Sequence, residues 1–276
     1  MRLRLGTRGS ALALAQARWV AERLAGEVEL VELTTAGDVQ RDVGDKSRWT
    51  GALERALLAG EIDVAVHSAK DVPVELAAGT RIAAVPARED ARDVLVGAPS
   101  LEGLPAGARV GTSALRRRAQ VLAVRPDLEV VELRGNVDTR LRKLAAGEAD
   151  ALVLAAAGLA RLGRDDATGS SLPFVPAPGQ GALLVQARED VRLPELDDAG
   201  ARAALEAERA VAAALGASCH TALGVHAAGG VVRAWAGLPD GSEWIADEAE
   251  SAEAVAGRLL AVGAADLLAR SEAIAA

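Results

Sequence analysis

A lysine and an aspartate follow an apolar stretch in the first third of the sequence. Residues 62–67 have the composition of a buried strand, Lys70 and Asp71 come just after it, and Pro73 ends the segment. Open α/β sheets bind their ligands at the carboxyl ends of the strands. A carboxylate at such an edge can stabilise a developing cation and carry a proton. Asp71 could equally be a helix cap or one half of a surface ion pair.

Arginine supplies nearly all of the positive charge, because the chain has only three lysines. Several arginines stand just after predicted strands or in the first turns of predicted helices, namely Arg8, Arg18, Arg116, Arg117, Arg134, Arg140 and Arg161. A guanidinium binds a carboxylate through two parallel hydrogen bonds, and helix N-termini also attract anions. The pattern therefore predicts an anion-binding site. Arginine runs are often solvated faces, and we interpret Arg118 and Arg142 in that way.

Cys219 is the only cysteine and follows a predicted helix that ends near Gly216. A single cysteine cannot form an internal disulfide, which is consistent with a reducing compartment. The side chain could be buried packing, and its neighbour His220 also raises the possibility of a cysteine nucleophile. The three histidines show neither the spacing of a Cys–His hydrolase nor that of a metal site. We therefore predict no bound metal.

Composition restricts the class of protein. The 276 residues carry a net charge of −8, and only 2% of them are aromatic. Neither property suits a nucleic-acid binder or a protein that adheres to anionic membranes. The longest apolar run, residues 151–160, is about half of what a bilayer requires. Arg8 and Arg18 also interrupt the apolar stretch near the N-terminus, so we expect a cytoplasmic protein.

Strands and helices alternate along the first part of the chain, which is the pattern of an α/β fold. The predicted elements are a strand at residues 2–5, a helix from the N-cap Ser10 to Leu24, a strand at 28–33, a helix around 53–57 and the strand at 62–67. A weak internal repeat follows, in which residues 109–120 resemble residues 5–16. Residues 147–153 likewise resemble residues 60–66. The repeat indicates two similar lobes, although two generic βα units could produce the same match.

Proline- and glycine-rich stretches at residues 86–105 and 172–181 indicate the domain boundaries. We predict a first domain of residues 1–88 and 180–200, a second of residues 89–179, and a third of residues 201–276. The third would be a small α+β domain with a long helix from about Arg202 to Leu215, alternating residues near 231–235 and a helix from about Ala252.

Seven stretches, taken in order, resemble the hydroxymethylbilane synthase (porphobilinogen deaminase) family. They are residues 6–16, 66–73, 110–117, 134–141, 157–162, 176–182 and the loop that contains Cys219. The resemblance runs from residue 2 to about residue 225. Any one of these motifs alone would be weak evidence, and it is their shared order that makes the resemblance specific.

The resemblance implies an enzyme of tetrapyrrole (haem and porphyrin) biosynthesis. Members condense four porphobilinogen molecules head to tail, release ammonia at each step, and finally hydrolyse off linear hydroxymethylbilane. The family fold has two α/β lobes, similar to periplasmic binding proteins, around a cleft, and a small α+β C-terminal domain. A dipyrromethane cofactor, which the enzyme assembles itself, would be bound through a thioether to Cys219.

The resemblance also assigns roles to residues, with Asp71 as the catalytic carboxylate beside the pyrrole nitrogens. Besides Cys219, the implied cofactor-binding residues are Ser68, Lys70, Thr112, Ser113, Arg116, Arg117 and Arg140. The implied substrate-binding residues are Arg8, Ser10, Gln16, Arg134 and Arg161. These types suit the chemistry, because loss of ammonia leaves a cation on the pyrrole and each added ring brings two carboxylates.

The sequence departs from the family pattern at several places. Residues 39–48 form a short loop where the family has a longer one that is thought to be a mobile lid, and Trp49 takes the place of a phenylalanine. The other departures are Gly51 and Ala52 for Lys-Glu, Ala114 for a serine, and His220 and Thr221 after the cysteine. A non-catalytic two-lobe anion-binding protein and an inactive paralogue remain as alternatives, although a pure binder has no need of Cys219. We expect a monomer without nucleic-acid or membrane partners.

Overall fold

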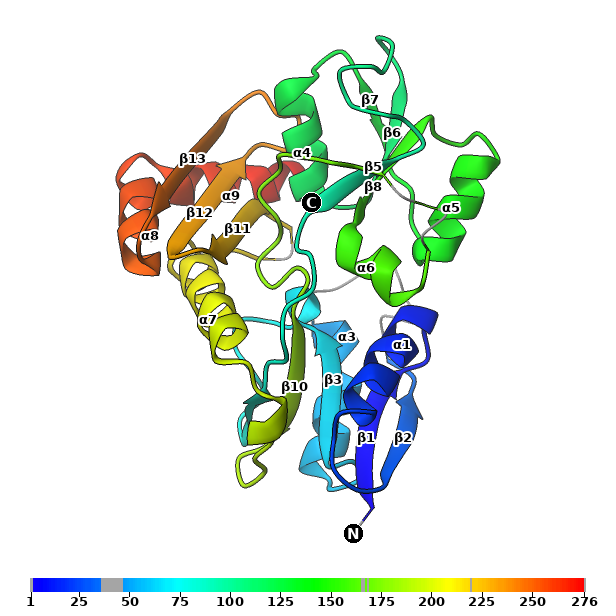
Figure 1. The fold of residues 1–276 in the computed structure, drawn as a ribbon. Helices are drawn as coiled ribbons and strands as arrows, with labels where there is room; N and C mark the ends of the chain where they lie inside the picture. The colour runs from blue at the N-terminus through cyan, green and yellow to red at the C-terminus, as the bar shows by residue number, and fades with distance from the viewer. Residues whose placement is uncertain (1, 36–46, 165–166, 168, 219, 276) are drawn as a thin grey trace. The chain divides into compact units, whose positions relative to one another are not determined.

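A computed structural model describes residues 2–35, 47–164, 167, 169–218 and 220–275 (Figure 1). The chain divides into two compact units. The first contains the residues up to Glu89 together with Gly179–Glu206, and the second contains Asp90–Pro178 together with the residues from Ala207 onward. The predicted division into three domains stays a prediction.

The first unit is built on a five-stranded sheet with the order β2-β1-β3-β10-β4. Its elements are β1 (Leu3–Arg8), α1 (Ala11–Ala21), β2 (Val28–Leu33), α3 (Ser47–Leu58), β3 (Val64–Ser68), the 3₁₀ turn η1 (Ala69–Asp71), β4 (Thr80–Ala84), β10 (Leu183–Arg188) and the 3₁₀ turn η3 (Pro194–Leu196). β1 pairs in parallel with β2 and β3, whereas β10 runs antiparallel to β3 and β4. The carboxyl ends of β1 and β3 therefore lie at the same edge of the sheet.

Three of the predicted elements in this unit have different bounds in the structure. The strand predicted at residues 62–67 begins at Val64 and ends at Ser68. The first strand continues to Arg8, beyond the predicted end at residue 5, because it pairs with β2 along its whole length. The first helix ends at Ala21 before the predicted Leu24, because Arg23 N–H and Leu24 N–H bond to carbonyls three residues back. Such bonds tighten the last turn into a 3₁₀ form.

α1 and α3 cover opposite faces of this sheet (Figure 1). Side chains alternate along a strand, so β3 places Val64 and Val66 in the core beside α1, and Ala65 in the core beside α3. By the same alternation His67 is on the α3 face and Ser68 is on the α1 face. The side chains of the last two residues of β3 therefore lie on opposite faces of the sheet, at the same edge.

The second unit contains another five-stranded sheet, with the order β7-β6-β8-β5-β9. Its elements are β5 (Asp93–Val96), β6 (Arg109–Gly111), α4 (Leu115–Val124), β7 (Glu129–Val131), α5 (Val137–Ala145), β8 (Ala151–Ala155), α6 (Ala156–Arg161) and β9 (Ser170–Ser171). β6 pairs in parallel with β7 and β8, and β5 runs antiparallel to β8 and β9. The sheet thus repeats the arrangement of the first, which confirms the two α/β lobes.

The two five-stranded sheets also share an ion pair between an arginine and an aspartate at equivalent positions. The Asp63 carboxylate accepts hydrogen bonds of 2.8 Å from both Arg4 N and Arg4 Nη2. The Asp150 carboxylate accepts hydrogen bonds from Arg109 N at 2.7 Å and from Arg109 Nη2 at 3.2 Å. These bonds hold the pKa of both carboxyl groups below the usual value. Each pair joins the start of a central strand to the start of its parallel neighbour.

A three-stranded antiparallel sheet completes the second unit. It consists of β11 (Ala222–Ala228), β12 (Val231–Gly237) and β13 (Trp244–Ala249), and its helices are α8 (Ala252–Ala261) and α9 (Ala264–Ala275). The helix α7 (Ala199–Ala214) begins in the first unit and continues into the second after Glu206. One face of the sheet packs with α8 and α9, and the other face places Ala222 and Trp235 against Ala119 of α4. The predicted α+β character of this region is therefore confirmed. α7 begins earlier than predicted, because Asp198 Oδ1 caps it by accepting from Ala201 N at 2.7 Å.

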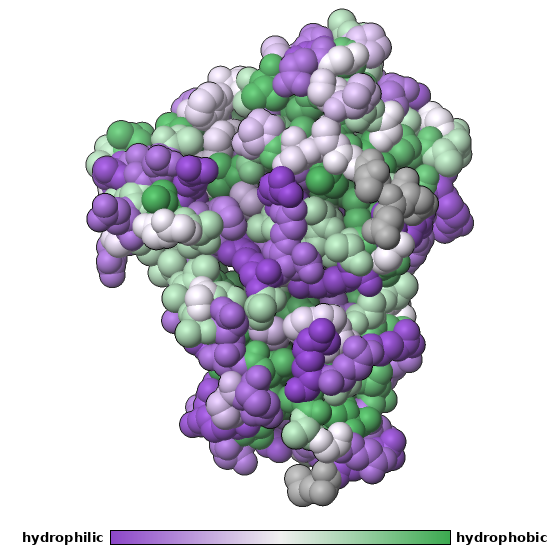
Figure 2. Space-filling model, in the orientation of Figure 1, coloured by the Kyte–Doolittle hydropathy of each residue, from purple (hydrophilic) through white to green (hydrophobic). Residues whose placement is uncertain are grey.

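The surface is mixed in character. Figure 2 shows hydrophilic and hydrophobic residues interspersed over the visible face. Within the described ranges, α7 is the longest helix, and no helix is both long and apolar enough to span a bilayer.

Candidate functional site

A pocket opens in the first unit where β1 and β3 end. Its walls come from the end of β1, the beginnings of α1 and α3, and the segment that joins β3 to η1. The lining residues are Arg8, Ser10, Leu12, Ala13, Gln16, Trp49, Thr50, Val66, His67, Ser68 and Asp71. Five residues predicted to act at the site, Arg8, Ser10, Gln16, Ser68 and Asp71, thus meet in one pocket. Lys70, also predicted, lies half-buried on η1 and is outside this lining.

α1 contributes polar groups that are held in place by hydrogen bonds. Ser10 is the N-cap of the helix, and its hydroxyl accepts from Ala13 N at 3.3 Å. Gln16 is 3% exposed and its Nε2 donates to Ser68 Oγ at 2.8 Å. Ser68 Oγ in turn donates to Gln16 Oε1 at 3.2 Å. This reciprocal pair joins α1 to the end of β3, so both side chains have a fixed orientation.

α3 contributes an aromatic ring to the same pocket. The guanidinium carbon of Arg8 lies 4.0 Å from the centre of the Trp49 ring, which is a cation–π contact. A guanidinium that stacks on an aromatic ring binds a planar anion such as a carboxylate through its edge. Trp49, the residue that departs from the family's phenylalanine, is therefore part of the pocket wall.

Asp71 is half-buried at the end of η1. Its carboxylate makes no hydrogen bond or ion pair with any residue in the described ranges. Within the described ranges the structure thus gives no support to the interpretation of Asp71 as a helix cap or as one half of a surface ion pair. A carboxylate that faces a pocket without a protein partner is available to a ligand.

η1 is held from the other side by the segment that precedes β10. Ala69 N donates to Ala182 O at 3.0 Å. Gly179 has a φ of +77°, and a Cβ atom built on it would lie 2.9 Å from both Ala69 C and Lys70 N. Only glycine allows this approach, so the Pro-Gly-Gln-Gly segment sets the position of the turn that carries Asp71.

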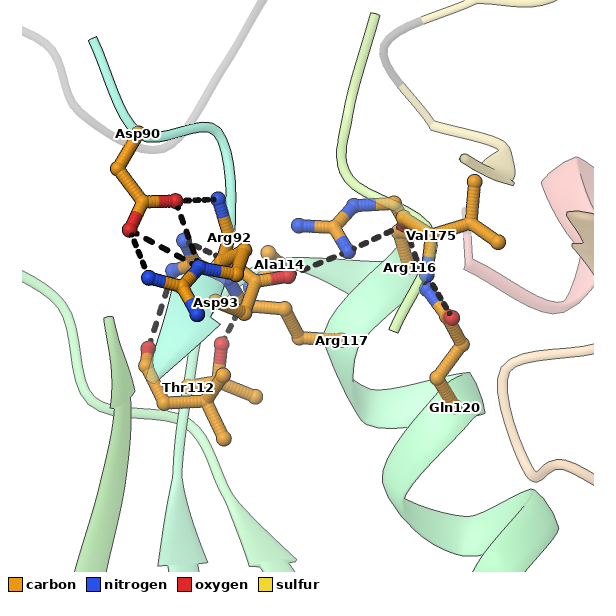
Figure 3. A network of polar contacts seen from close by, with 10 residues as sticks. Asp90, Arg92, Asp93, Thr112, Ala114, Arg116, Arg117, Gln120 and Val175 are labelled. Carbon is orange, nitrogen blue, oxygen red and sulfur yellow. Dashed lines mark hydrogen bonds and ion pairs between the residues drawn. The ribbon is translucent and has the colours of Figure 1, made fainter. Parts of the chain in front are cut away.

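A second group of polar residues lies in the second unit, around the buried Asp93 (Figure 3). Arg116 Nη1 is 2.7 Å from Asp93 Oδ2, and Arg117 Nε donates to Asp93 Oδ1 at 2.9 Å. Each guanidinium also donates to a backbone carbonyl, Arg116 to Val175 and Arg117 to Val153. Burial and the neighbouring Arg116 lower the pKa of Arg117, whereas Asp93 raises it. Two cations thus face one anion, and the group has a net positive charge.

Asp93 was not among the predicted site residues. It is the first residue of β5, and the only signal in the sequence is an acidic residue directly before the apolar Val94–Val96 stretch. Arg116 and Arg117 are each 5% exposed. Their predicted contact with a cofactor therefore involves little of their surface and stays a prediction.

Ala114 stands at the start of α4, where the family has a serine. Ala114 is the N-cap residue and has no side chain that can cap the helix. Thr112 Oγ1 accepts from Ala114 N at 3.2 Å (Figure 3), so the neighbouring hydroxyl supplies a bond at this turn. Gln120 fixes the Val175 backbone through bonds of 3.0 Å and 2.8 Å.

The other site residues predicted in this unit are Ser113, Arg134, Arg140 and Arg161. Ser113 Oγ accepts from Arg140 Nη2 at 2.8 Å, so these two are brought together. Arg134 is exposed and its Nε donates to Glu132 Oε1 at 2.6 Å. Arg161 is the last residue of α6. The roles of these four residues stay predictions.

Cys219 lies outside the described residues, as do residues 39–46 of the short loop. Residues near Cys219 in the described ranges make side-chain hydrogen bonds. Ser218 Oγ donates to Glu272 Oε1 of α9 at 2.8 Å, and Thr221 Oγ1 donates to Ser218 O at 2.9 Å.

The sequence matches the family model described as "Porphobilinogen deaminase, dipyromethane cofactor binding domain" over residues 3–193. The chain belongs to the porphobilinogen deaminase family. Relatives named porphobilinogen deaminase match along nearly the whole chain. The relative from Rubrobacter xylanophilus is 47% identical over 97% of this chain and 96% of its own length. The relative from Deinococcus deserti is 44% identical over 96% and 97%.

Solved structures of periplasmic proteins are also similar to part of the chain. A periplasmic substrate-binding protein of an ABC transporter from Coxiella burnetii matches 70% of this chain and 88% of its own, with 16% identity and a TM-score of 0.41. The periplasmic VFT2 domain of Bordetella pertussis BvgS matches 69% and 82%, with 16% identity and a TM-score of 0.40. These scores are too low to assign a fold, so the description of the lobes rests on the sheet order given above.

The pocket residues suit the dipyrromethane group and the pyrroles that porphobilinogen deaminases handle, since these rings carry N–H donors and carboxylate side chains. Arg8 can bind a carboxylate, and Asp71 can accept from a ring N–H. The donor set of the first unit therefore fits such a group.

Gly179→Ala tests how this family member positions Asp71. The added methyl would displace η1, and we expect kcat to fall by up to about 100-fold because small displacements of catalytic groups are costly. Gly107→Ala is the matched control, because Gly107 has the same φ of +77° and an added Cβ atom there would have nothing within 4 Å. Both variants should lose about 1–3 kcal/mol from the positive φ. Equal kcat values in the two variants would contradict the positioning role.

Proposed function

We propose that this chain carries out the hydroxymethylbilane synthase reaction. It would condense four porphobilinogen molecules, release one ammonia per molecule, and then release linear hydroxymethylbilane by hydrolysis. The observation that carries this proposal is the Asp71 carboxylate, which faces a pocket beside Arg8 without a partner in the described part of the chain. Membership of the porphobilinogen deaminase family supports the same reaction.

Asp71 would act on the reacting pyrrole. In each cycle the C–N bond of the aminomethyl group breaks, and the electron pair leaves with the nitrogen as ammonia. The remaining pyrrole carries a positive charge, which a carboxylate near the ring N–H stabilises. A C–C bond then forms to the free α carbon of the growing chain, and the proton on that carbon is lost to a base. Asp71, which lines the pocket, would stabilise the charge and carry the proton.

Arg8 would hold a carboxylate side chain of the substrate while Asp71 acts on the ring. The cation–π contact with Trp49 restrains the guanidinium, so less conformational freedom is lost on binding. Ser10, Gln16 and Ser68 would supply further hydrogen bonds from the same pocket. Lys70, Thr112, Ser113, Arg116, Arg117, Arg134, Arg140 and Arg161 are proposed for the remaining carboxylates of cofactor and product.

The dipyrromethane cofactor supplies a bound pyrrole primer from which the chain grows. We propose that Cys219 holds it through a thioether. Hydrogen bonds restrain the residues that flank Cys219 in the described ranges, Ser218 and Thr221. A cysteine needs no base partner in this role when the electrophile that it meets is reactive.

Cys219→Ser should give protein without a covalent cofactor, because a serine hydroxyl is a far weaker nucleophile than a thiol. The intact mass of the wild type should exceed the polypeptide mass by two porphobilinogen units less the ammonia lost. Ser242→Ala is the control and should keep the adduct, since Ser242 is exposed and the change leaves the thiol in place. An adduct that persists in Cys219→Ser would show that the attachment site lies elsewhere.

We also propose that the protein is cytoplasmic and monomeric and that it has no nucleic-acid partner. The net charge of −8 and the low aromatic content support a protein without a nucleic-acid partner. The single cysteine supports a cytoplasmic location. We further propose a monomer, because two lobes and a small domain on one chain supply all of the implied site residues.

A further inference from the structure

His67 lies in the pocket but has no role in the reaction described above. It is the penultimate residue of β3, is 7% exposed, and lines the pocket together with Arg8 and Asp71. Its Nε2 atom is buried, and its side chain lies within hydrogen-bonding reach of Gln186. The unused imidazole is therefore a candidate for contact with the substrate.

Gln186 on the neighbouring strand β10 restricts the imidazole. Gln186 is fully buried, and its Nε2 donates to Thr80 Oγ1 at 2.8 Å and to Glu54 Oε1 at 3.1 Å. These two bonds fix the amide, and they leave Gln186 Oε1 as a buried acceptor. An N–H on His67 Nε2 is the donor that such an oxygen favours. The favoured tautomer thus carries its proton on Nε2 and leaves Nδ1 as a hydrogen-bond acceptor.

The surroundings also keep the imidazole neutral. The pKa of His67 is lowered to about 4, chiefly by burial and also by the nearby charge of Arg8, while the hydrogen bond with Gln186 acts in the opposite direction. The other ionisable groups near this end of the sheet are Asp71 on η1, which lines the same pocket, and Glu54 on α3, which bonds to Gln186. At neutral pH the ring is therefore an uncharged acceptor of very low basicity.

We propose that His67 is a further substrate-binding residue, which accepts a hydrogen bond from the aminomethyl group of porphobilinogen. This inference rests on the proposed function. The aminomethyl group of the free substrate is an ammonium ion, because alkylamines have pKa values near 10. A weakly basic acceptor binds this ion without removing its proton. When the C–N bond breaks, the electron pair stays with the nitrogen, which leaves as neutral ammonia and needs no further proton.

A charged imidazolium in this place would oppose binding. It has no lone pair to accept a hydrogen bond, and it would repel the ammonium ion. The Asp71 carboxylate alone attracts the ammonium group of the substrate but does not fix the orientation of its C–N bond. His67 and Asp71 line one pocket, so together they can orient the leaving group and stabilise the ring charge that follows.

The test compares two substrates on two variants of the cofactor-loaded enzyme. His67→Phe keeps a ring of similar size but removes the acceptor, and His67→Asn keeps a neutral acceptor. The second substrate is the analogue of porphobilinogen in which a hydroxymethyl group replaces the aminomethyl group, so it carries no positive charge. We expect kcat/KM for porphobilinogen to fall about 10- to 100-fold in His67→Phe, the value of a hydrogen bond to a charged group. The analogue should change by less than about threefold, and His67→Asn should fall between the wild type and His67→Phe.

An equal loss for both substrates would show that His67 only packs the pocket, and unchanged kinetics for both would also overturn the proposal. A wild-type enzyme that does not consume porphobilinogen would instead refute the proposed function. Nitrogen NMR of the ¹⁵N-histidine-labelled holoenzyme adds a readout that needs no folded variant of His67. The signal lost in His67→Asn identifies the residue, and we expect a neutral ring protonated on Nε2 at pH 7. A ring protonated on Nδ1, or charged, would overturn the proposal.

Discussion

Asp71→Asn is expected to lower kcat by about 100- to 1000-fold, which is the usual effect of removing one preorganised electrostatic group. Asparagine has nearly the same shape as aspartate but no charge, so it can fill the pocket without stabilising the cation. The carboxylate makes no hydrogen bond or ion pair within the described ranges. The substitution should therefore leave the melting temperature close to that of the wild type.

The matched control is Glu75→Gln, which makes the same chemical change at an exposed residue just beyond the motif. It should keep wild-type kcat. Activity is expressed per mole of cofactor-loaded enzyme, with loading measured by intact mass, so that a defect in cofactor assembly is not mistaken for a defect in turnover. Asp71→Glu should recover part of the lost activity because it restores the charge. Wild-type activity in Asp71→Asn would refute the catalytic assignment.

The place of Asp71 could be predicted from the sequence because the signals that set it are local. An apolar stretch predicts β3, a proline ends the segment, and parallel strands bring their carboxyl ends to one edge. Ser10 as an N-cap is local in the same way, and the structure confirms it. The pocket that these residues line follows from elements that the sequence specifies over short distances.

The partner of the two arginines could not be predicted, because it is distant in the sequence and hidden by burial. Asp93 precedes Arg116 by 23 residues and reaches it only after β5 and α4 have packed. Sequence patterns show that arginines are clustered, but they do not distinguish cations that await a ligand from cations that are already paired. The same applies to His67, whose orientation depends on Gln186, a residue on a strand that enters the sheet from more than 100 positions away.

Asp93→Asn is expected to cause the largest loss of stability, about 3–5 kcal/mol, because it removes a negative charge that two buried guanidinium groups contact. Asp93 is fully buried and both arginines are 5% exposed, so solvent screens little of the effect. For a chain of this size the melting temperature should fall by roughly 6–20 °C. Asp90→Asn is the control, because Asp90 pairs with the largely exposed Arg92. An exposed pair contributes at most about 1 kcal/mol. Similar melting temperatures for the two variants would contradict the role of Asp93.

A double variant separates the stability of this group from its proposed contact with the cofactor. The cost of Asp93→Asn arises from the two buried cations that lose this negative charge, so removing one of them with Arg117→Met should restore part of the lost stability. The intact mass of the Asp93→Asn, Arg117→Met protein then tests the assigned role of Arg117. A stable protein without the adduct would mean that Arg117 binds both Asp93 and the cofactor. A stable protein with the normal adduct would mean that Arg117 serves the fold, and that the cofactor carboxylates bind to arginines that Asp93 does not hold.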